Sequence, residues 1–219
     1  MFLFSKTSSV KKTNSKKRSQ PKAKKRTLKK RNNKKSGNPV FENVKRGSPE
    51  MNKINGPATV KFQDNAVEEG TFIAGKLTGQ GTITKYDGKK IFAVLKGEFK
   101  NGRLNGKGTK KTKSFFNSLE EGTFKDGLLN GLGKKSYLSS KETQEGNFKD
   151  GELSGKGKKT YGDSKNKLIS EQGIFVVKMR GLPSMLSKGK KVYRNGHTEE
   201  GKFKITEDGD VYFKEELVK

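Results

Sequence analysis

The stretch GEFKNGRLNGKG at residues 97–108 decides the fold, because the chain repeats it. Six of its positions recur as Gly-x-Phe-x-x-Gly-x-Leu-x-Gly-x-Gly, and the four regular copies start 27, 25 and 24 residues apart, at Gly70, Gly97, Gly122 and Gly146. Two degenerate copies follow before residue 213, which makes about six repeats. A period of this length is typical of stacked supersecondary units, each packed only against its neighbours.

Each copy is predicted to form a β-hairpin. Three of the four regular copies have Asn-Gly or Asp-Gly at their centre, at residues 101–102, 126–127 and 150–151. These pairs favour a two-residue turn because Gly, Asn and Asp tolerate positive φ. A two-residue turn sets the register of the hairpin, so Phe99 is predicted to lie opposite Leu104.

The same register, continued without interruption, places glycines opposite each other, starting with Gly97 and Gly106. The equivalent pairs are Gly122 with Gly131 and Gly146 with Gly155. Because residues two apart share a face, each Gly–Gly pair lies beside a Phe–Leu pair. Glycine inside a strand often marks the close approach of another group. We therefore expect an aromatic ring from a neighbouring strand to pack on this bare backbone.

An isolated hairpin is marginally stable in water, so the hairpins are expected to stack side by side. The predicted fold is all-β: one elongated, single-layer antiparallel sheet with an open edge strand at each end. Hydrophobic residues make up only 28% of the chain, which favours a thin apolar layer whose rings stay partly exposed. The predicted members of this layer are Phe72, Phe99, Phe124, Phe148, Phe175, Phe203, Leu77, Leu104, Leu129 and Leu153.

The charge of the chain is concentrated near its N-terminus. The net charge is +27, and residues 1–46 hold 17 basic residues against one acidic residue, Glu42. A segment of such low hydrophobicity and high charge cannot bury enough surface to offset the entropy of ordering it. Residues 1–46 are therefore predicted to be a disordered basic arm, followed by a junction at 47–57, the repeat sheet at 58–213 and a tail at 214–219.

A polyanion is the expected partner of this arm. Fifteen basic residues between residues 5 and 36 would bind phosphates by counterion release, with little preference for sequence. No aromatic residue lies between Ser5 and Asn38, so base stacking is not indicated. Nucleic acid is the first interpretation, an anionic membrane surface is the alternative, and the basic clusters are also typical of nuclear localisation signals. The candidate anion-binding residues are Lys11, Lys12, Lys16, Lys17, Arg18, Lys24, Lys25, Arg26, Lys29, Lys30, Arg31, Lys34 and Lys35.

A second candidate anion site follows from the repeats. Two positions beyond the last glycine of successive copies, the residue is lysine: Lys110, Lys135, Lys159 and Lys191. Equivalent residues of adjacent hairpins should recur every ~10 Å, so these residues are predicted to form a lysine column along the sheet. The column is either a track for phosphates or a solvated polar face that prevents aggregation.

Groups that support catalysis are scarce. His197 is the only histidine and follows a turn-like Asn-Gly, and the chain has no cysteine. The carboxylates at Glu69, Glu121, Glu145 and Glu200 recur at one position of successive copies, so they are not expected to converge. We expect no enzyme activity, metal, cofactor or small-molecule substrate. No stretch approaches the ~20 apolar residues of a membrane helix, and the opening Met-Phe-Leu-Phe is too short for a secretion signal, so we expect a protein that is not secreted.

The repeats resemble the MORN repeat, whose usual form is Tyr-x-Gly-x-Trp/Phe-x-x-Gly-x-x-x-Gly-x-Gly. The resemblance covers about residues 56–213 and is closest over 69–161. It implies a scaffolding and dimerising module of a kind found in cytoskeletal, membrane-junction and viral proteins, for which phosphoinositide binding has been proposed. The family's tyrosine is missing, so no role of that tyrosine carries over. Its positions here hold Glu68, Leu95, Glu120, Gln144, Glu171 and Glu199.

The function predicted from the sequence is that of a non-enzymatic structural protein. The sheet would associate with a second copy or a protein partner through a face or an edge. The arm would tether it to nucleic acid, in a nucleus or inside a virion. A peripheral membrane adaptor that binds anionic phospholipids is the alternative.

Overall fold

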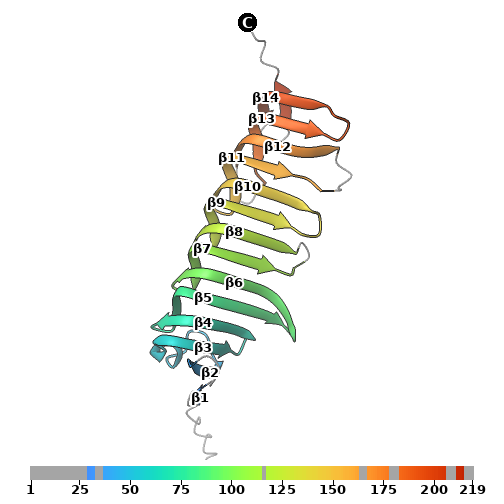
Figure 1. Ribbon diagram of the computed structural model, residues 1–219. Helices are drawn as coiled ribbons and strands as arrows, with labels where there is room; N and C mark the ends of the chain where they lie inside the picture. The colour runs from blue at the N-terminus through green and yellow to red at the C-terminus, as the bar shows by residue number, and fades with distance from the viewer. Residues whose placement is uncertain are drawn as a thin grey trace, which may run out of the picture.

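The computed structural model describes residues 29–32, 37–114, 117–162, 167–177, 183–205 and 211–214. They form one 15-stranded sheet whose strands follow chain order, drawn out along one axis (Figure 1). The strands are β1 (Lys29–Asn32), β2 (Pro39–Val44), β3 (Gly56–Phe62), β4 (Ala66–Ile73), β5 (Lys76–Asp87), β6 (Lys90–Lys100), β7 (Arg103–Thr112), β8 (Ser118–Lys125), β9 (Leu128–Tyr137), β10 (Glu142–Lys149), β11 (Glu152–Thr160), β12 (Leu168–Val176), β13 (Met185–Tyr193), β14 (Thr198–Ile205) and β15 (Val211–Lys214). The prediction of an all-β sheet of stacked antiparallel hairpins is confirmed.

The sheet begins earlier than the predicted boundary at residue 46. Strands β1 and β2 lie inside the segment assigned to the basic arm, and the side chains of Val40 and Val44 are buried in the sheet. The boundary was wrong because PVFENV at 39–44 is a short apolar segment directly after the basic run. It pairs with β3 in parallel, the one departure from the predicted antiparallel order among the described strands. Residues 1–28 and 33–36, where the rest of the predicted disordered arm lies, fall outside the described residues.

The predicted junction is a packed cap rather than a loose connection. It contains a short 3-10 helix, η1 (Met51–Lys53), followed by the buried Ile54. The backbone N–H of Gly75, in the first hairpin turn, donates to the Ile54 carbonyl at 3.0 Å. Each later turn repeats this bond on the leucine of the hairpin before it: Gly102 to Leu77, Gly127 to Leu104 and Gly151 to Leu129. Ile54 therefore takes the place that a preceding hairpin's leucine would occupy.

The hairpin turns have the predicted geometry. Asn101 and Gly102 both have positive φ, 53° and 78°, as a type I′ turn requires. Phe99 lies opposite Leu104, and Lys100 lies opposite Arg103, as the two-residue turn predicts.

The predicted glycine pairs were wrong by two residues. Gly97 lies opposite Gly108 rather than Gly106, because the register shifts between Gly97 and Phe99. The same shift pairs Gly122 with Gly133 and Gly146 with Gly157. Such a bulge bends the strand. Gly97, beside this bulge, has φ of 141°, which is accessible to glycine but strained for other residues.

The close approach that the strand glycines predicted is present, but an aromatic ring is not the main neighbour. A Cβ on Gly97 would lie 2.5 Å from the Cα of Gly108 across the ladder. A Cβ on Gly108 would lie 3.0 Å from the Cδ2 of Leu104 on its own strand. A ring atom is among the three nearest atoms at Gly133, where Phe148 Cδ2 would lie 3.6 Å from a Cβ, but not at Gly97 or Gly108. The glycines therefore let two backbones and a leucine meet at the bend.

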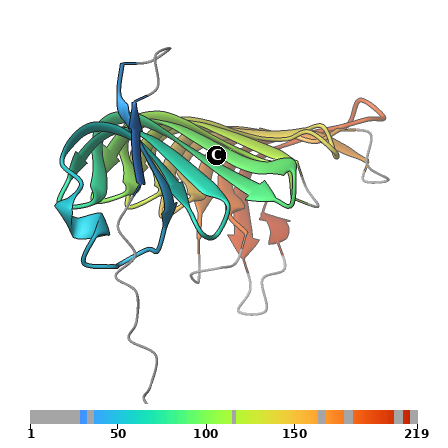
Figure 2. The same ribbon diagram turned by 90° about the horizontal axis from the view of Figure 1, so that it is seen from below.

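Seen from below, the sheet curves into an open trough (Figure 2). The predicted phenylalanines and leucines line its inner face as one continuous cluster. Their burial is far deeper than expected for a thin sheet: Phe124 is 2% exposed and Leu104 is 0% exposed. The expectation of partly exposed rings was wrong because it assumed flat strands, whereas the bulged strands fold the hairpin ends over the layer.

The fifth repeat contains a leucine that the sequence pattern missed. Leu186 lies opposite Phe175 and is buried, so it occupies the same position as Leu153 in the fourth repeat. The pattern missed it because only two residues, instead of three, separate it from Gly189. A register shift between Ile174 and Phe175 absorbs the difference.

Candidate functional site

The lysine column lies on the inner face of the trough and alternates with the residues that replace the family's tyrosine. Lys110 lies between Leu95 and Glu120 on the neighbouring strands, and Lys135 between Glu120 and Gln144. The pattern continues to β14, and we call it the inner charge ladder. Its members are Lys110, Glu120, Lys135, Gln144, Lys159, Glu171, Lys191 and Glu199.

The ladder amines are engaged inside the protein. Lys110 Nζ lies 3.2 Å from Glu120 Oε1, and Lys191 Nζ lies 3.7 Å from Glu171 Oε1. Lys135 Nζ donates to the Gly151 carbonyl at 3.2 Å. Lys159 is only 7% exposed and donates to the Ser184 carbonyl. Burial lowers the pKa of Lys159, and the nearby Glu171 carboxylate partly opposes that change.

This geometry supports neither interpretation of the lysine column. Lys159 Nζ lies 5.2 Å from the centre of the Phe175 ring, and Lys191 Nζ lies 4.5 Å from that of Phe203. The lysines thus run over the apolar layer and end beside aromatic faces or carboxylates. A solvated face and an open phosphate track both require accessible amines. The column's placement favours a structural role.

Both carboxylate oxygens of Glu171 have a side-chain partner, on two different residues. Its Oε2 accepts the Tyr161 hydroxyl at 2.5 Å, and its Oε1 faces Lys191. Burial and the adjacent negative charge raise the pKa of Tyr161, so this hydroxyl stays protonated as a donor. The buried Oε1 of Gln144, on the other side of Lys159, has no hydrogen-bond partner among the described atoms.

The remaining predicted carboxylates and the histidine lie outside the trough. Glu145 and Glu200 face Lys134 and Lys190 at 3.9 and 4.0 Å on the exposed outer face. His197 is exposed in the turn before β14, with its Nε2 3.7 Å from Glu199. Within the described ranges, no three His, Cys, Asp or Glu residues cluster as metal ligands would.

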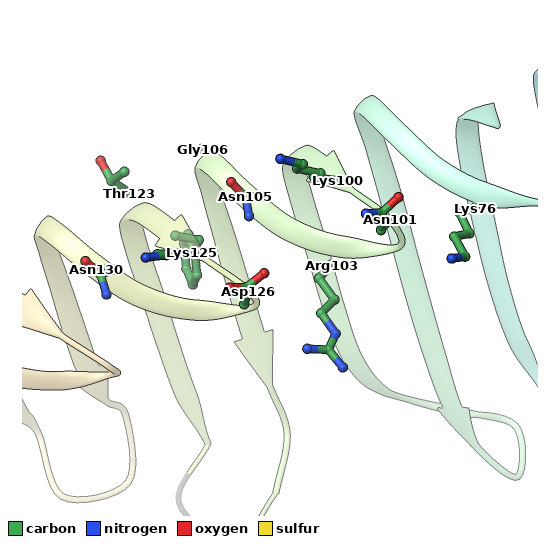
Figure 3. Close-up of a pocket in the computed structure, with 11 residues that line it drawn as sticks. Lys76, Lys100, Asn101, Arg103, Asn105, Gly106, Thr123, Lys125, Asp126 and Asn130 are labelled. Carbon is green, nitrogen blue, oxygen red and sulfur yellow. The ribbon is translucent and has the colours of Figure 1, made fainter. Parts of the chain in front are cut away.

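A polar hollow of about 780 Å³ opens among the turns of the β4–β5, β6–β7 and β8–β9 hairpins (Figure 3). We call it the turn hollow. Its lining combines four cations, three amides and a hydroxyl with one carboxylate. The lining residues are Lys76, Lys100, Asn101, Arg103, Asn105, Gly106, Thr123, Phe124, Lys125, Asp126 and Asn130.

The cations of the turn hollow are free of ion pairs. Lys76, Lys100, Arg103 and Lys125 are exposed, and none has a carboxylate within 4.0 Å in the part of the chain that the structure describes. Asp126 is the single acidic residue of the lining. The Glu98 carboxylate lies at the rim, where it covers Gly106. The hollow therefore carries an excess of unpaired positive charge, unlike the ladder.

Comparison with known families identifies the repeats. A family model for the MORN repeat matches residues 69–90, 96–113, 121–138 and 145–165. The chain contains MORN repeats. No curated protein matches it. MORN repeats are in general modules of proteins that bind other proteins or associate with membranes. Among the described residues, no helix is long and apolar enough to cross a membrane.

The MORN model stops at residue 165, but the sheet does not. Strands β12 to β15 continue the sheet with antiparallel pairing, and Phe175 and Phe203 remain in the apolar layer. The glutamates at the MORN tyrosine position face inward, and Glu68, Glu120 and Glu171 are buried. A buried acid in place of an aromatic ring requires a cation beside it, which the ladder lysines and, at Glu68, Arg46 at 2.7 Å supply.

The anion-binding residues predicted in the basic arm fall into two groups, those on β1 and those outside the described residues. Lys29, Lys30 and Arg31 belong to β1, opposite residues 40–42 of β2. The ten other predicted arm residues lie outside the described residues: Lys11, Lys12, Lys16, Lys17, Arg18, Lys24, Lys25, Arg26, Lys34 and Lys35. Sequence reasoning missed the turn hollow, because its charged and polar residues occupy variable positions of the MORN pattern. The available signal was that Lys-Asn-Gly-Arg and Lys-Asp-Gly recur at consecutive turns.

Proposed function

We propose that this MORN-repeat protein is a non-enzymatic scaffold that a basic N-terminal segment tethers to nucleic acid. The sheet binds a second copy or another protein. The observation that carries the tether is the charge of residues 1–46, 17 basic residues against one acidic. A polyanion binds such a segment by releasing counterions, with little dependence on sequence. A nuclear or virion location suits a protein with this partner.

The absence of enzyme activity is part of the proposal. The described residues hold no metal cluster, and the lone His197 sits in an exposed turn beside one carboxylate. The lysines of the inner charge ladder form ion pairs with its glutamates or hydrogen bonds to backbone carbonyls. Assembly is supported by the outermost strands, which offer unpaired backbone groups to another chain, and by the exposed Leu132 on the outer face.

A salt titration tests the tether. Full-length protein and a variant lacking residues 5–28 are compared on duplex DNA, RNA and anionic liposomes. This deletion removes ten basic residues and keeps β1. If six to ten phosphates are contacted, affinity for nucleic acid should fall by roughly 10³–10⁵ between 50 and 200 mM salt. The deletion should remove most of that affinity. Equal affinity of the two proteins would contradict the tether.

One feature favours an anionic membrane as the second candidate partner. At the β5–β6 turn, Ile91 and Phe92 are 42% and 40% exposed. They line a shallow hollow together with Asp87, Lys89, Lys90 and Lys113. Exposed apolar side chains among lysines suit insertion at the lipid headgroup level. Tight liposome binding that Phe92→Ser weakens, without comparable binding of nucleic acid, would establish this function instead.

A further inference from the structure

We propose that the turn hollow is a second contact site for the phosphate backbone of nucleic acid, located on the folded sheet. This inference rests on the proposed function, because the basic N-terminal segment would bring the same nucleic acid to the sheet. The hollow would hold the strand against the scaffold in one place, whereas the N-terminal segment alone would bind it anywhere.

Charge complementarity is the first support. Four of the eleven lining residues are cations without an ion pair among the described residues, against one lining carboxylate, Asp126. Elsewhere on the sheet, some cations are paired, as Lys110 and Lys191 are in the ladder and Lys134 is on the outer face. Others, such as Lys149 and Lys156, are exposed but do not line this hollow. Unpaired cations gathered in a depression attract polyanions.

The neutral lining residues fit the sugar–phosphate chain rather than the bases. Asn101, Asn105, Asn130 and Thr123 offer amide and hydroxyl groups of the types that bind phosphate and sugar oxygens. The one aromatic residue of the lining, Phe124, is buried in the apolar layer and offers no ring for stacking. The hollow would therefore bind without preference for base sequence.

The dimensions also suit a polynucleotide. The cations come from three successive hairpins, from Lys76 through Lys100 and Arg103 to Lys125. Adjacent hairpins are about 10 Å apart, so the cations span about 20 Å. This length corresponds to about six steps of a duplex at 3.4 Å each. A narrow phosphate chain can enter a hollow between turns, whereas the flat surface of a bilayer would contact only the rim of the hollow.

The hollow is specific to these turns, which provides a control. At the turn of the fourth hairpin, beyond the hollow, Glu152 occupies the position that Arg103 holds in the second hairpin, and Asp150 replaces Asn101. Lys149 there corresponds to Lys100, and both side chains are exposed. The same backbone thus carries a basic hollow at one end and a turn without excess positive charge further along.

The first test measures binding of a 20-base-pair duplex to full-length variants. Lys100→Gln with Arg103→Gln should reduce the slope of log affinity against log salt by about 1.8, and the affinity at 100 mM salt roughly 50-fold. The control, Lys149→Gln with Lys156→Gln, removes the same charge from exposed sites and should change the slope by less than about 0.5. Equal slopes for the two double variants would overturn the proposal. All four side chains are exposed, so thermal melts should coincide.

The second test reads each lysine separately in the unmodified chain. Lysine acetylation followed by mass spectrometry, with and without the duplex, should show Lys76, Lys100 and Lys125 protected and Lys149 unchanged. Protection of Lys24 and Lys25 without protection of the hollow would overturn this inference and leave the tether intact. The reverse result would overturn the tether and support the hollow. Protection by anionic liposomes rather than by DNA would overturn both in favour of the membrane.

Discussion

The inner row of the trough is apolar near the start of the repeats and charged further along. Ile83 and Leu95 fill it on β5 and β6, whereas lysines alternate with Glu or Gln from β7 to β14. The strands pair antiparallel in both stretches, and a register shift lies beside or near the paired glycines of the first five hairpins. The fold therefore accepts either chemistry, provided that every buried acid has a cation beside it, as Glu68 has in Arg46.

The difference indicates what the ladder contributes. Replacing a buried ion pair by apolar residues of similar volume is often neutral or stabilising, so the charges are not needed for stability. The neighbouring Phe–Leu layer is common to both ends and buries the largest side chains. We infer that the Phe–Leu layer supplies most of the stability of the fold. The inner charge ladder instead favours the correct register between neighbouring strands.

Removing a ring from the shared layer should have the largest effect. Phe124→Ala is expected to lower the free energy of unfolding by about 3–5 kcal/mol, because the ring is fully buried and its neighbours on two hairpins cannot close the cavity. The control is Lys125→Ala at the adjacent exposed position, expected within about 0.5 kcal/mol. Thermal and urea unfolding measure both. Equal melting temperatures would place the stability outside the apolar layer.

Breaking the charged end of the row should have the next largest effect. Glu171→Ala leaves the buried Lys159 and the half-buried Lys191 without their shared carboxylate and leaves the Tyr161 hydroxyl without its acceptor. We expect a loss of about 3 kcal/mol in urea unfolding. Glu145→Ala removes an exposed carboxylate from the outer face of β10, two strands away, and should cost less than about 1 kcal/mol. Similar losses for the two variants would show that inner and outer ion pairs are equivalent.

Replacing a charged pair of the inner row by apolar residues should change the free energy of unfolding only slightly. Lys110→Ile with Glu120→Leu copies the chemistry of Ile83 and Leu95 onto the next two strands. We expect the free energy of unfolding of the double variant to exceed that of the wild type by between zero and about 2 kcal/mol. Each single substitution should be destabilising, because it leaves one buried charge unpaired. A double variant less stable than both single variants would mean that the ladder itself holds the fold.

The smallest effect should be the pH dependence contributed by Lys159. Its pKa is lowered in the folded protein from the ordinary 10.5, so the native state loses this proton first as the pH rises. The stability of the wild type relative to Lys159→Met should therefore increase from the lowered pKa up to 10.5 and be constant below it. The pKa of Tyr161 is raised, and the pKa of Tyr193 is raised to about 12. Both shifts lower the stability of wild type and variant alike above pH 10, so the difference between the two proteins isolates Lys159. A difference independent of pH would contradict the burial of the amine.

Local chemistry was enough to predict the hairpins. The Asn-Gly and Asp-Gly turns depend only on the φ that those residues tolerate, and a two-residue turn leaves one register for the residues next to it. The pairing of Phe99 with Leu104 was therefore predictable from twelve residues. The family assignment followed in the same way, from fixed positions in phase.

The register beyond the bulge was not predictable, because nothing in the pattern says where a strand takes in extra residues. Two residues of shift changed every partner further along, including those of Gly97 and of the ladder lysines. Lys159 is buried and Lys191 is half-buried, both beside aromatic rings, although the sequence had assigned them to solvent or phosphate. Counting along an unbroken ladder cannot reveal such partners.

The sequence by itself determined the repeat, the turn, the aromatic layer and the uneven charge, because each depends on residue type and on spacing within one hairpin. Only the tertiary structure decided that the sheet bends into a trough, that the lysine column pairs with Glu120 and Glu171, and that Lys76, Arg103 and Lys125 meet at the turn hollow. These features join residues of different hairpins. Their positions depend on how each bulge turns its strand, and therefore on the packing of the whole stack.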